Sequence, residues 1–294
     1  MSTTTTSHDT AHDTARGTSP AGSVPTGSGR VGLARVVRAE WTKLASLRST
    51  WFLLLLVVVL GVGLATIAGW GSSQAIDATE AGTPPPGGPP GGLGADALGA
   101  SVLASTTLGT LLLGVLGALV MSGEYSTGTA TATLTAVPRR WPVLLAKAVL
   151  LVLVTAPVGF VVSVAGFLLG ESFLPASASL ALGDPGTWPA VLATTASMVA
   201  TALLGLGLAT LLRSTAGAIT ALVALTFIGP PLLGLVPWDW VQTATEHIPS
   251  TAAGSIGLYA GDPVLSTTAA VLTLVGWAVV PLVAGLVVLQ RRDV

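Results

Sequence analysis

Few side chains in this sequence are suited to catalysis or to binding a metal ion. There is no cysteine, and only three histidines are present. His8 and His12 have the i, i+4 spacing of two metal ligands, but they lie in a polar stretch without a structured frame, where two histidines bind a metal weakly. The adjacent Glu246 and His247 are the one candidate pair for acid–base chemistry, and two neighbours on one loop specify little. We therefore expect no enzyme activity, no cofactor and no metal site in this chain.

The sequence also lacks a site for ATP. It has no G-x-x-x-x-G-K-[ST] motif, and its only lysines, Lys43 and Lys147, do not follow a glycine-rich loop. If the protein performs uphill work, it must draw the energy from elsewhere.

The charged residues gather in segments that flank long apolar stretches. The first, residues 31–48, is predicted to be an amphipathic helix in the membrane interface, because its apolar residues fall within an arc of roughly 140°. These residues are Leu33, Val36, Val37, Trp41, Leu44 and Leu47, with Arg35 and Arg38 on the opposite side. Glu40 interrupts the apolar arc. It either pairs with Lys43 at i, i+3, which the angles favour, or meets a positive group on another helix or on a partner protein.

The second charged segment covers residues 122–147. It opens with Gly123-Glu124-Tyr125 and closes with Val137-Pro138-Arg139-Arg140-Trp141-Pro142. In between, Thr alternates with small or apolar residues from Thr127 to Thr135. The period of two favours a strand, but an isolated strand would have no partner, so a short helix that ends before Pro138 is the alternative.

The composition places most of the chain in a membrane. Of the 294 residues, 51% are hydrophobic and 9% are charged, whereas a soluble domain has about 25% charged residues. A soluble enzyme, a secreted disulfide scaffold and a disordered chain are excluded. Six apolar stretches are long enough to cross the bilayer, which predicts an all-α polytopic membrane protein. The stretches lie at about residues 51–70, 98–121, 148–170, 190–212, 216–236 and 264–289.

None of these predicted spans contains an ionisable residue. Transporters that couple to protons or sodium ions usually carry such residues within the bilayer, and channels need a polar filter or a charged ring. The sequence therefore favours neither class.

The positive charges indicate the orientation. All twelve Lys and Arg residues fall in alternate connecting segments, and the positive-inside rule assigns that side to the cytoplasm. Both termini are then cytoplasmic, with residues 1–29 as a disordered tail and residues 30–294 as a six-helix transmembrane domain in the cell membrane.

Seven tryptophans agree with this orientation, because they fall at the predicted interfaces. They are Trp41, Trp51 and Trp141 on the cytoplasmic side and Trp70, Trp188, Trp238 and Trp240 on the outer side. Trp277 falls within a span, where helix packing explains it.

Two patterns bear on how the spans are shaped and packed. Pro230 and Pro231 each lack a backbone donor and should interrupt or kink the fifth span. The small-residue pairs Gly114/Ala118 and Gly205/Ala209 are either close helix contacts or chance, since Gly and Ala are abundant.

Taken together, these features resemble the membrane subunit of type-2 ATP-binding-cassette (ABC) exporters, in the form common in actinomycete bacteria. The resemblance covers residues 31–294 and includes the six-span layout with both termini inside. Its motifs are Arg38-Ala-Glu40-Trp41-Thr-Lys43-Leu-Ala-Ser-Leu-Arg48-Ser-Thr-Trp51, then Gly123-Glu124-Tyr125-Ser-Thr-Gly128-Thr129 running on to Arg139-Arg140, and finally Ile248-Pro249-Ser250.

The resemblance implies a permease that exports a substrate with ATP hydrolysed on a separate cytoplasmic ATPase subunit. It implies a second permease as partner, in a homo- or heterodimer within the lipid bilayer, and no nucleic acid. A connecting helix would precede the first span, and a re-entrant helical region would follow the fifth. The connecting helix would contain Glu40, Trp41, Lys43 and Arg48, and the segment that couples to the ATPase would contain Gly123, Glu124, Tyr125, Gly128, Thr129, Arg139 and Arg140. Glu40 and Glu124 would meet Arg or Lys at the ATPase joint, or Glu124 is simply a helix N-terminal charge favoured by the dipole.

Two further function classes stay open. A non-transporting membrane protein, such as a sensor or an assembly partner, could dock a cytoplasmic protein on its basic inner face. A lipid-modifying membrane enzyme would have to rely on Glu246 and His247. The sequence identifies no substrate.

Overall fold

A computed structural model describes residues 33–83, 95–104, 106–126, 141–258 and 262–291. The chain divides into two units, Met1–Arg30 and Val31–Val294, and every described residue belongs to the second unit. The predicted tail, residues 1–29, lies outside the described residues, and so does the Thr-rich run from Thr127 to Thr135.

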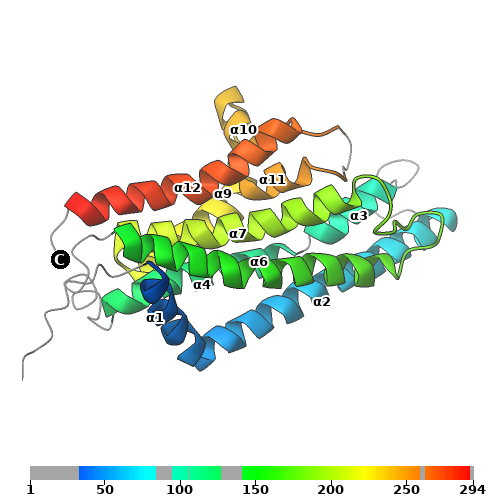
Figure 1. The fold of residues 1–294 in the computed structure, drawn as a ribbon. Helices are drawn as coiled ribbons and strands as arrows, with labels where there is room; N and C mark the ends of the chain where they lie inside the picture. The colour runs from blue at the N-terminus through cyan, green and yellow to red at the C-terminus, as the bar shows by residue number, and fades with distance from the viewer. Residues whose placement is uncertain (1–32, 84–94, 105, 127–140, 259–261, 292–294) are drawn as a thin grey trace, which may run out of the picture. The chain divides into compact units, whose positions relative to one another are not determined.

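The described part contains six apolar helical segments long enough to cross a membrane, as predicted. The short helix α1 precedes them, and two more short helices lie between the last two segments (Figure 1). The elements in chain order are α1 (Leu33–Ser46), α2 (Arg48–Glu80), α3 (Ala95–Ala104), α4 (Thr107–Ser126), α6 (Trp141–Glu171), α7 (Thr187–Leu212), α8 (Thr215–Val223), the π-helix η1 (Ala224–Ile228), α9 (Gly229–Leu233), α10 (Asp239–Glu246), α11 (Pro249–Gly254) and α12 (Thr267–Arg291). The prediction of an all-α polytopic membrane protein is confirmed.

Two of the long helices extend well beyond the predicted spans. Helix α2 continues to Glu80, ten residues past the predicted end, and α6 begins at Trp141, seven residues before the predicted start. Hydropathy detects only the apolar part of a helix, whereas backbone hydrogen bonds continue through polar residues at its ends. Lys147 therefore lies inside α6. The prediction that placed it in a connecting segment is wrong.

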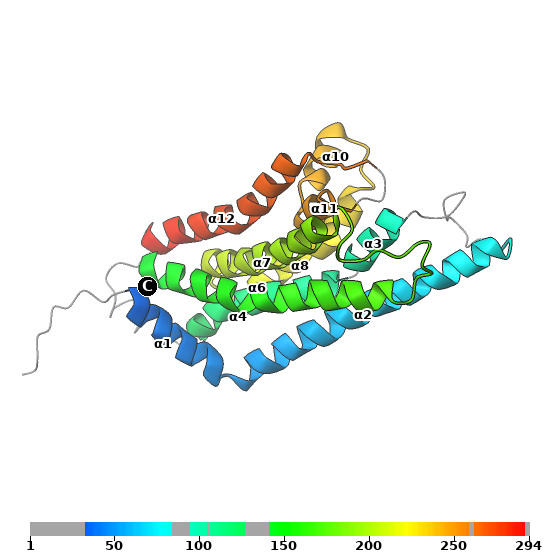
Figure 2. The same cartoon turned by 45° about the vertical axis from the view of Figure 1, so that its right-hand side comes forward.

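Helix α7 is the centre of the bundle. It packs against α4, α6 and α12, while α2 and α12 occupy opposite flanks (Figure 2). Its sequence is rich in Ala, Gly, Ser and Thr, and small residues let helix backbones approach closely in a membrane. Below, the end of the bundle that carries α1 is called the α1 end, and the other is called the opposite end.

The small-residue pairs of the second and fourth spans contact each other. A Cβ atom added at Gly205 would lie 2.0 Å from the backbone oxygen of Gly114 and 3.0 Å from the backbone nitrogen of Ala118. No real Cβ atom tolerates such a distance, so the α4–α7 crossing depends on glycine at position 205. Of the two interpretations of these pairs, close helix contact is confirmed.

The fifth span departs from α-helical geometry where the prolines predict it. Helix α8 passes into η1, and the N–H of Gly229 bonds to the carbonyl of Ala224, five residues back. Pro230 and Pro231 follow at once and have no N–H to donate. A Cβ atom at position 229 would lie 2.4 Å from the Ala224 oxygen, so glycine is required at this turn.

The connection between α10 and α11 reaches back along the last span. The indole Nε1 of Trp277 donates a hydrogen bond of 2.6 Å to the carbonyl of His247. Trp277 lies ten residues from the start of α12, which is about 15 Å along the helix. Sequence analysis assigned Trp277 to helix packing, but its indole also fixes the α10–α11 connection against the side of α12.

We expect Gly205→Ala to destabilise the bundle by roughly 1–3 kcal/mol, because the added methyl overlaps the α4 backbone. Gly63→Ala in α2 is the matched control, since a Cβ atom there has no neighbour within 4 Å. Thermal unfolding of the purified proteins in one detergent would measure the difference. Equal melting temperatures for Gly205→Ala and the wild type would show that the crossing is looser than described.

Candidate functional site

Four charged side chains from three helices form a closed ring at the α1 end. Lys43 Nζ donates to Glu40 Oε1 and to Glu124 Oε1, each at 2.8 Å. Lys147 Nζ donates to Glu40 Oε2 at 2.5 Å and to Glu124 Oε1 at 2.9 Å. Glu40 and Lys43 belong to α1, Glu124 to α4 and Lys147 to α6. We call these four residues the charged cluster; it joins helices that are far apart in the sequence.

Three of the four side chains in the charged cluster are buried. The side chain of Lys147 is 1% exposed, and those of Glu40 and Glu124 are 6% and 11% exposed. Lys43 closes the ring from the surface, with its side chain 47% exposed. Two carboxylates and two ammonium groups cancel in charge, which is the condition under which ionised groups can be held away from water.

Lys43 stays protonated in this arrangement. Burial by itself lowers the pKa of Lys43, but its hydrogen bonds to Glu124 and Glu40 and the charges of these carboxylates outweigh that effect and raise the pKa above its ordinary value. A lysine whose pKa is raised by folding stabilises the fold below its unfolded-state pKa. That contribution is lost only as the pH rises through the raised folded-state pKa, so it is fully present at neutral pH.

Helix α1 places Glu40 in its buried stripe. Val36, Glu40 and Leu44 follow one another at intervals of four residues, and all three are buried. Glu40, which interrupts the apolar arc, thus lies on the inward face of α1, where its carboxylate pairs with the ammonium group of Lys147. Glu40 pairs both with Lys43 on its own helix and with a cation on another helix, so both interpretations of this residue hold within the chain.

Sequence analysis missed Lys147, which it counted among the charges of a connecting segment. The signal was present in the spacing, since Leu144, Lys147 and Leu151 follow a helical period and all three are buried. Hydropathy windows start a span after a charged residue, so the lysine was cut away from the helix to which it belongs.

A third cation lies near the end of α4, the helix that carries Glu124. Arg213, just past the end of α7, places its guanidinium carbon 5.9 Å from the centre of the Tyr125 ring on α4. Its backbone has a φ of 51°, a conformation that ends the helix, and its N–H bonds to Ala209 O. The guanidinium atoms Nε and Nη2 are buried, and neither has a hydrogen-bond partner in the described part of the chain. These two nitrogens form one edge of the guanidinium, the edge that binds both oxygens of a carboxylate.

The structure describes some of the remaining residues that were predicted for the connecting helix and for coupling to the ATPase. Trp41 and Arg48 are exposed on α1 and at the start of α2, and Gly123 lies near the end of α4. Gly128, Thr129, Arg139 and Arg140 lie outside the described residues, as do His8 and His12.

The cluster lies within a region that matches a known family. A sequence model of the family described as "ABC-2 family transporter protein" matches residues 34–294. The chain belongs to this family. No curated protein matches the sequence significantly.

Membership in the ABC-2 family gives the charged cluster its context. The chain is a membrane permease subunit of an ABC transporter, and the permease domain is the transmembrane component. The cluster joins α1 to the end of α4 and the start of α6, which are the two ends of the segment 127–140. This arrangement of ion pairs can hold the three helices in a fixed relation.

We expect Lys147→Met to destabilise the permease by roughly 3–5 kcal/mol, because it removes the cation that is 1% exposed and leaves an apolar side chain against two carboxylates on the side that water does not reach. Lys43→Met removes contacts with the same two carboxylates but from the surface, and should cost less than about 1 kcal/mol. Unfolding by heat or denaturant in detergent would measure both.

The double variant Lys147→Met/Glu40→Gln restores the balance of charge and should recover part of the loss. If Lys43→Met proved as destabilising as Lys147→Met, burial would not be what makes the cluster matter.

Proposed function

We propose that this permease exports its substrate with energy from ATP hydrolysed on a separate cytoplasmic ATPase subunit, and that the charged cluster connects the ATPase-docking segment to the membrane helices. The observation that carries the proposal is the ring of ion pairs among α1, α4 and α6. ABC-2 permeases generally pair with a cytoplasmic ATPase and dimerise. The chain has no phosphate-binding loop of its own, which fits an ATPase on another subunit.

The cluster gives a route for force. The segment 127–140 follows α4 and precedes α6, so a push on it acts on the ends of both helices. Lys147 bonds to Glu40 and Glu124 together, and both are buried, so neither helix can separate from α1 without exposing an unpaired charge. Such a separation costs several kcal/mol in an apolar environment. The three helices therefore move as one body when the ATPase moves the segment.

In the sequence, the docking residues of the proposal lie directly before the segment and at its end. Gly123, Glu124 and Tyr125 lead into the segment, and Arg139 and Arg140 end it. The guanidinium of Arg213 lies over the ring of Tyr125, the last of the three residues that lead into the segment.

Tryptophan positions support an orientation with the α1 end in the cytoplasm. Trp41 lies in the second half of α1, Trp51 and Trp141 lie in the first turns of α2 and α6, and each of the three is at least 45% exposed. Trp70, Trp188, Trp238 and Trp240 lie toward the opposite end and are also exposed. Exposed indoles at two levels are typical of the two interfaces of a bilayer, and the Lys and Arg residues select the α1 end as the cytoplasmic one.

The orientation is testable because the sequence has no cysteine. A single introduced thiol then reports one position. We expect Ser177→Cys, exposed in the loop after α6, to react with a membrane-impermeant maleimide in intact cells. Ser46→Cys, exposed at the end of α1, should react only after the cells are permeabilised. Labelling of Ser46→Cys in intact cells would place α1 outside and remove the basis for a cytoplasmic partner.

The partner is testable by purification in mild detergent from the native host, with mass spectrometry of what accompanies the permease. We expect a stoichiometric soluble protein with a phosphate-binding loop. The double variant Arg139→Ala/Arg140→Ala should lower its recovery by at least about tenfold, because truncating interfacial charges weakens binding by 1.4 kcal/mol or more.

Arg291→Ala is the matched control, since it removes an exposed arginine at the α1 end of α12 that is not part of the segment 127–140. A permease that arrives alone, or with a partner that is not an ATPase, would favour the non-transporting docking protein over the exporter.

A further inference from the structure

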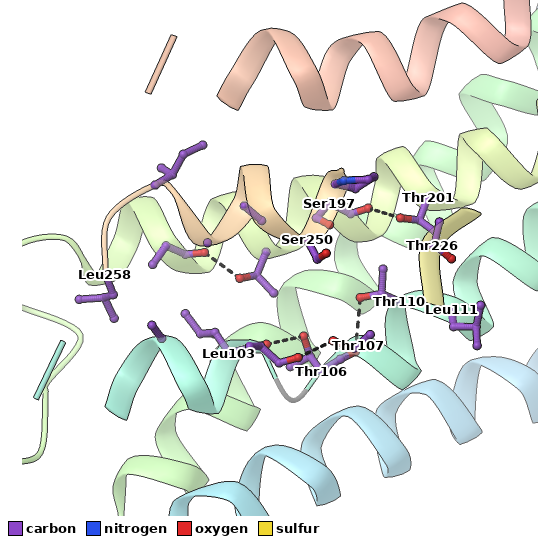
Figure 3. A pocket seen from close by; sticks show the side chains of 18 of the residues that line it. Leu103, Thr106, Thr107, Thr110, Leu111, Ser197, Thr201, Thr226, Ser250 and Leu258 are labelled. Carbon is purple, nitrogen blue, oxygen red and sulfur yellow. Dashed lines mark hydrogen bonds between the residues drawn. The ribbon is translucent and has the colours of Figure 1, made fainter. Parts of the chain in front are cut away.

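A cavity of about 100 Å³ lies where a break between two helices, a π-helix and a short α-helix meet (Figure 3). The first is the break between α3, which ends at Ala104, and α4, which begins at Thr107. The second is the π-helix η1, which contributes Thr226 and Phe227. The third is α11, the short helix after the connection that Trp277 holds. Irregular backbone within a membrane bundle is tolerated where it is covered by protein or lines a cavity, and π-helical turns are frequent at functional sites.

The cavity opens at the surface and ends against α7. Phe227, Ser250 and Gly254 line it and are exposed. Thr201 and Leu258 also line it, and each is 1% exposed. A molecule can therefore enter between η1 and α11 and reach the central helix of the bundle.

The wall of the cavity is apolar although many lining residues carry a hydroxyl. Thr194, Thr201 and Thr226 each donate their hydroxyl to a carbonyl one turn earlier on the same helix, at 2.8–2.9 Å. Their hydroxyls are thus used by the backbone, which leaves their methyl groups for the cavity. The remaining lining residues include Leu103, Ala190 and Ile256, and none of the lining residues is acidic or basic.

Two hydroxyls of the lining are not used in this way. Ser197 on α7 is 5% exposed and lines the cavity, and its hydroxyl makes no hydrogen bond in the described part of the chain. The hydroxyl of Ser250 on α11 also makes none there. Both hydroxyls therefore keep an unused donor and acceptor at the cavity, so a ligand that supplies a matching acceptor or donor would be stabilised at these positions.

We propose that this cavity binds an uncharged amphiphile, whose alkyl or ring body fills the apolar part while a hydroxyl or carbonyl group bonds to Ser197 and Ser250. A charged ligand would meet no opposite charge in the lining. Water alone is a poor occupant, because an ordered water needs two to four polar partners and most of the wall is methyl. The volume is of the order of engineered cavities that bind benzene-sized molecules, so it suits a short chain or one ring. The site lies away from the charged cluster and does not depend on the ATPase proposal.

The proposal is tested with the diazirine alcohol 3-azioctanol on the purified permease in phosphatidylcholine nanodiscs. Photolabelled residues are identified by mass spectrometry of peptides. We expect saturable labelling on α7, η1 and α11, with competition by 1-octanol and at least roughly tenfold weaker competition by octanoate, because its charge has no partner in the cavity. Octane, which cannot bond to the serines, should compete less well than 1-octanol.

Variants assign the labelling to the cavity. Ser197→Ala/Ser250→Ala should weaken saturable labelling by roughly three- to tenfold through the lost hydrogen bonds. Ser250→Trp should abolish it by filling the mouth. Leu272→Trp, which adds the same ring to an exposed position on α12, is the matched control and should leave labelling unchanged. Thermal unfolding confirms that each variant is folded.

Labelling that does not saturate and is spread over lipid-facing side chains would overturn the proposal. Labelling that survives Ser250→Trp unchanged would overturn it as well. Because the assay involves neither ATP nor transport, its outcome is separate from that of the purification experiment.

Discussion

The cytoplasm-facing half proposed for this permease depends on how one buried ammonium group is neutralised. Lys147 is 1% exposed and lies within an apolar helix, where an unpaired cation is strongly unfavourable. It is stabilised by a carboxylate from α1 and one from α4, and Lys43 balances the remaining charge from the surface. This need brings together three helices, two of which flank the segment that we propose docks the ATPase. Packing alone would allow α1 many orientations, whereas a ring of ion pairs permits few.

The rest of the bundle depends on close backbone approach. Lipid tails are as apolar as leucine, so burial of apolar surface gives little drive for helices to associate in a bilayer. Small residues on α4 and α7 allow the backbones to touch, as the 2.0 Å clash of a Cβ atom at Gly205 demonstrates. Helix α7 consequently holds the centre. The fifth span and α12 remain largely exposed on their outer faces, where lipid or another protein must cover them.

The opposite end follows another rule, that polar backbone groups within a membrane must be satisfied locally. Where α3 gives way to α4, the hydroxyls of Thr106 and Thr107 bond to the carbonyls of Leu103 and Ala104. At η1 the backbone hydrogen bonds shift by one residue ahead of Pro230. These local solutions leave space between the helices, and the cavity beside α7 is that space. Its chemistry is uncharged because the polar atoms around it are mostly bonded to their own helices.

The sequence by itself determined the six spans, because the thickness of the bilayer fixes how many apolar residues a helix needs and that length is visible along the chain. It also determined the interruption at Pro230 and Pro231, since a missing donor is a property of the residue, and it was enough to suggest the family. Only the tertiary structure decided the role of Lys147, whose partner Glu40 lies 107 residues away and which hydropathy had separated from its helix. It likewise decided that Gly114 and Gly205 lie in contact. The spacing of small residues could not show this, because Gly and Ala are so abundant that the same spacing also arises by chance. In each case the deciding quantity is a distance between segments, and patterns within one segment contain no information about it.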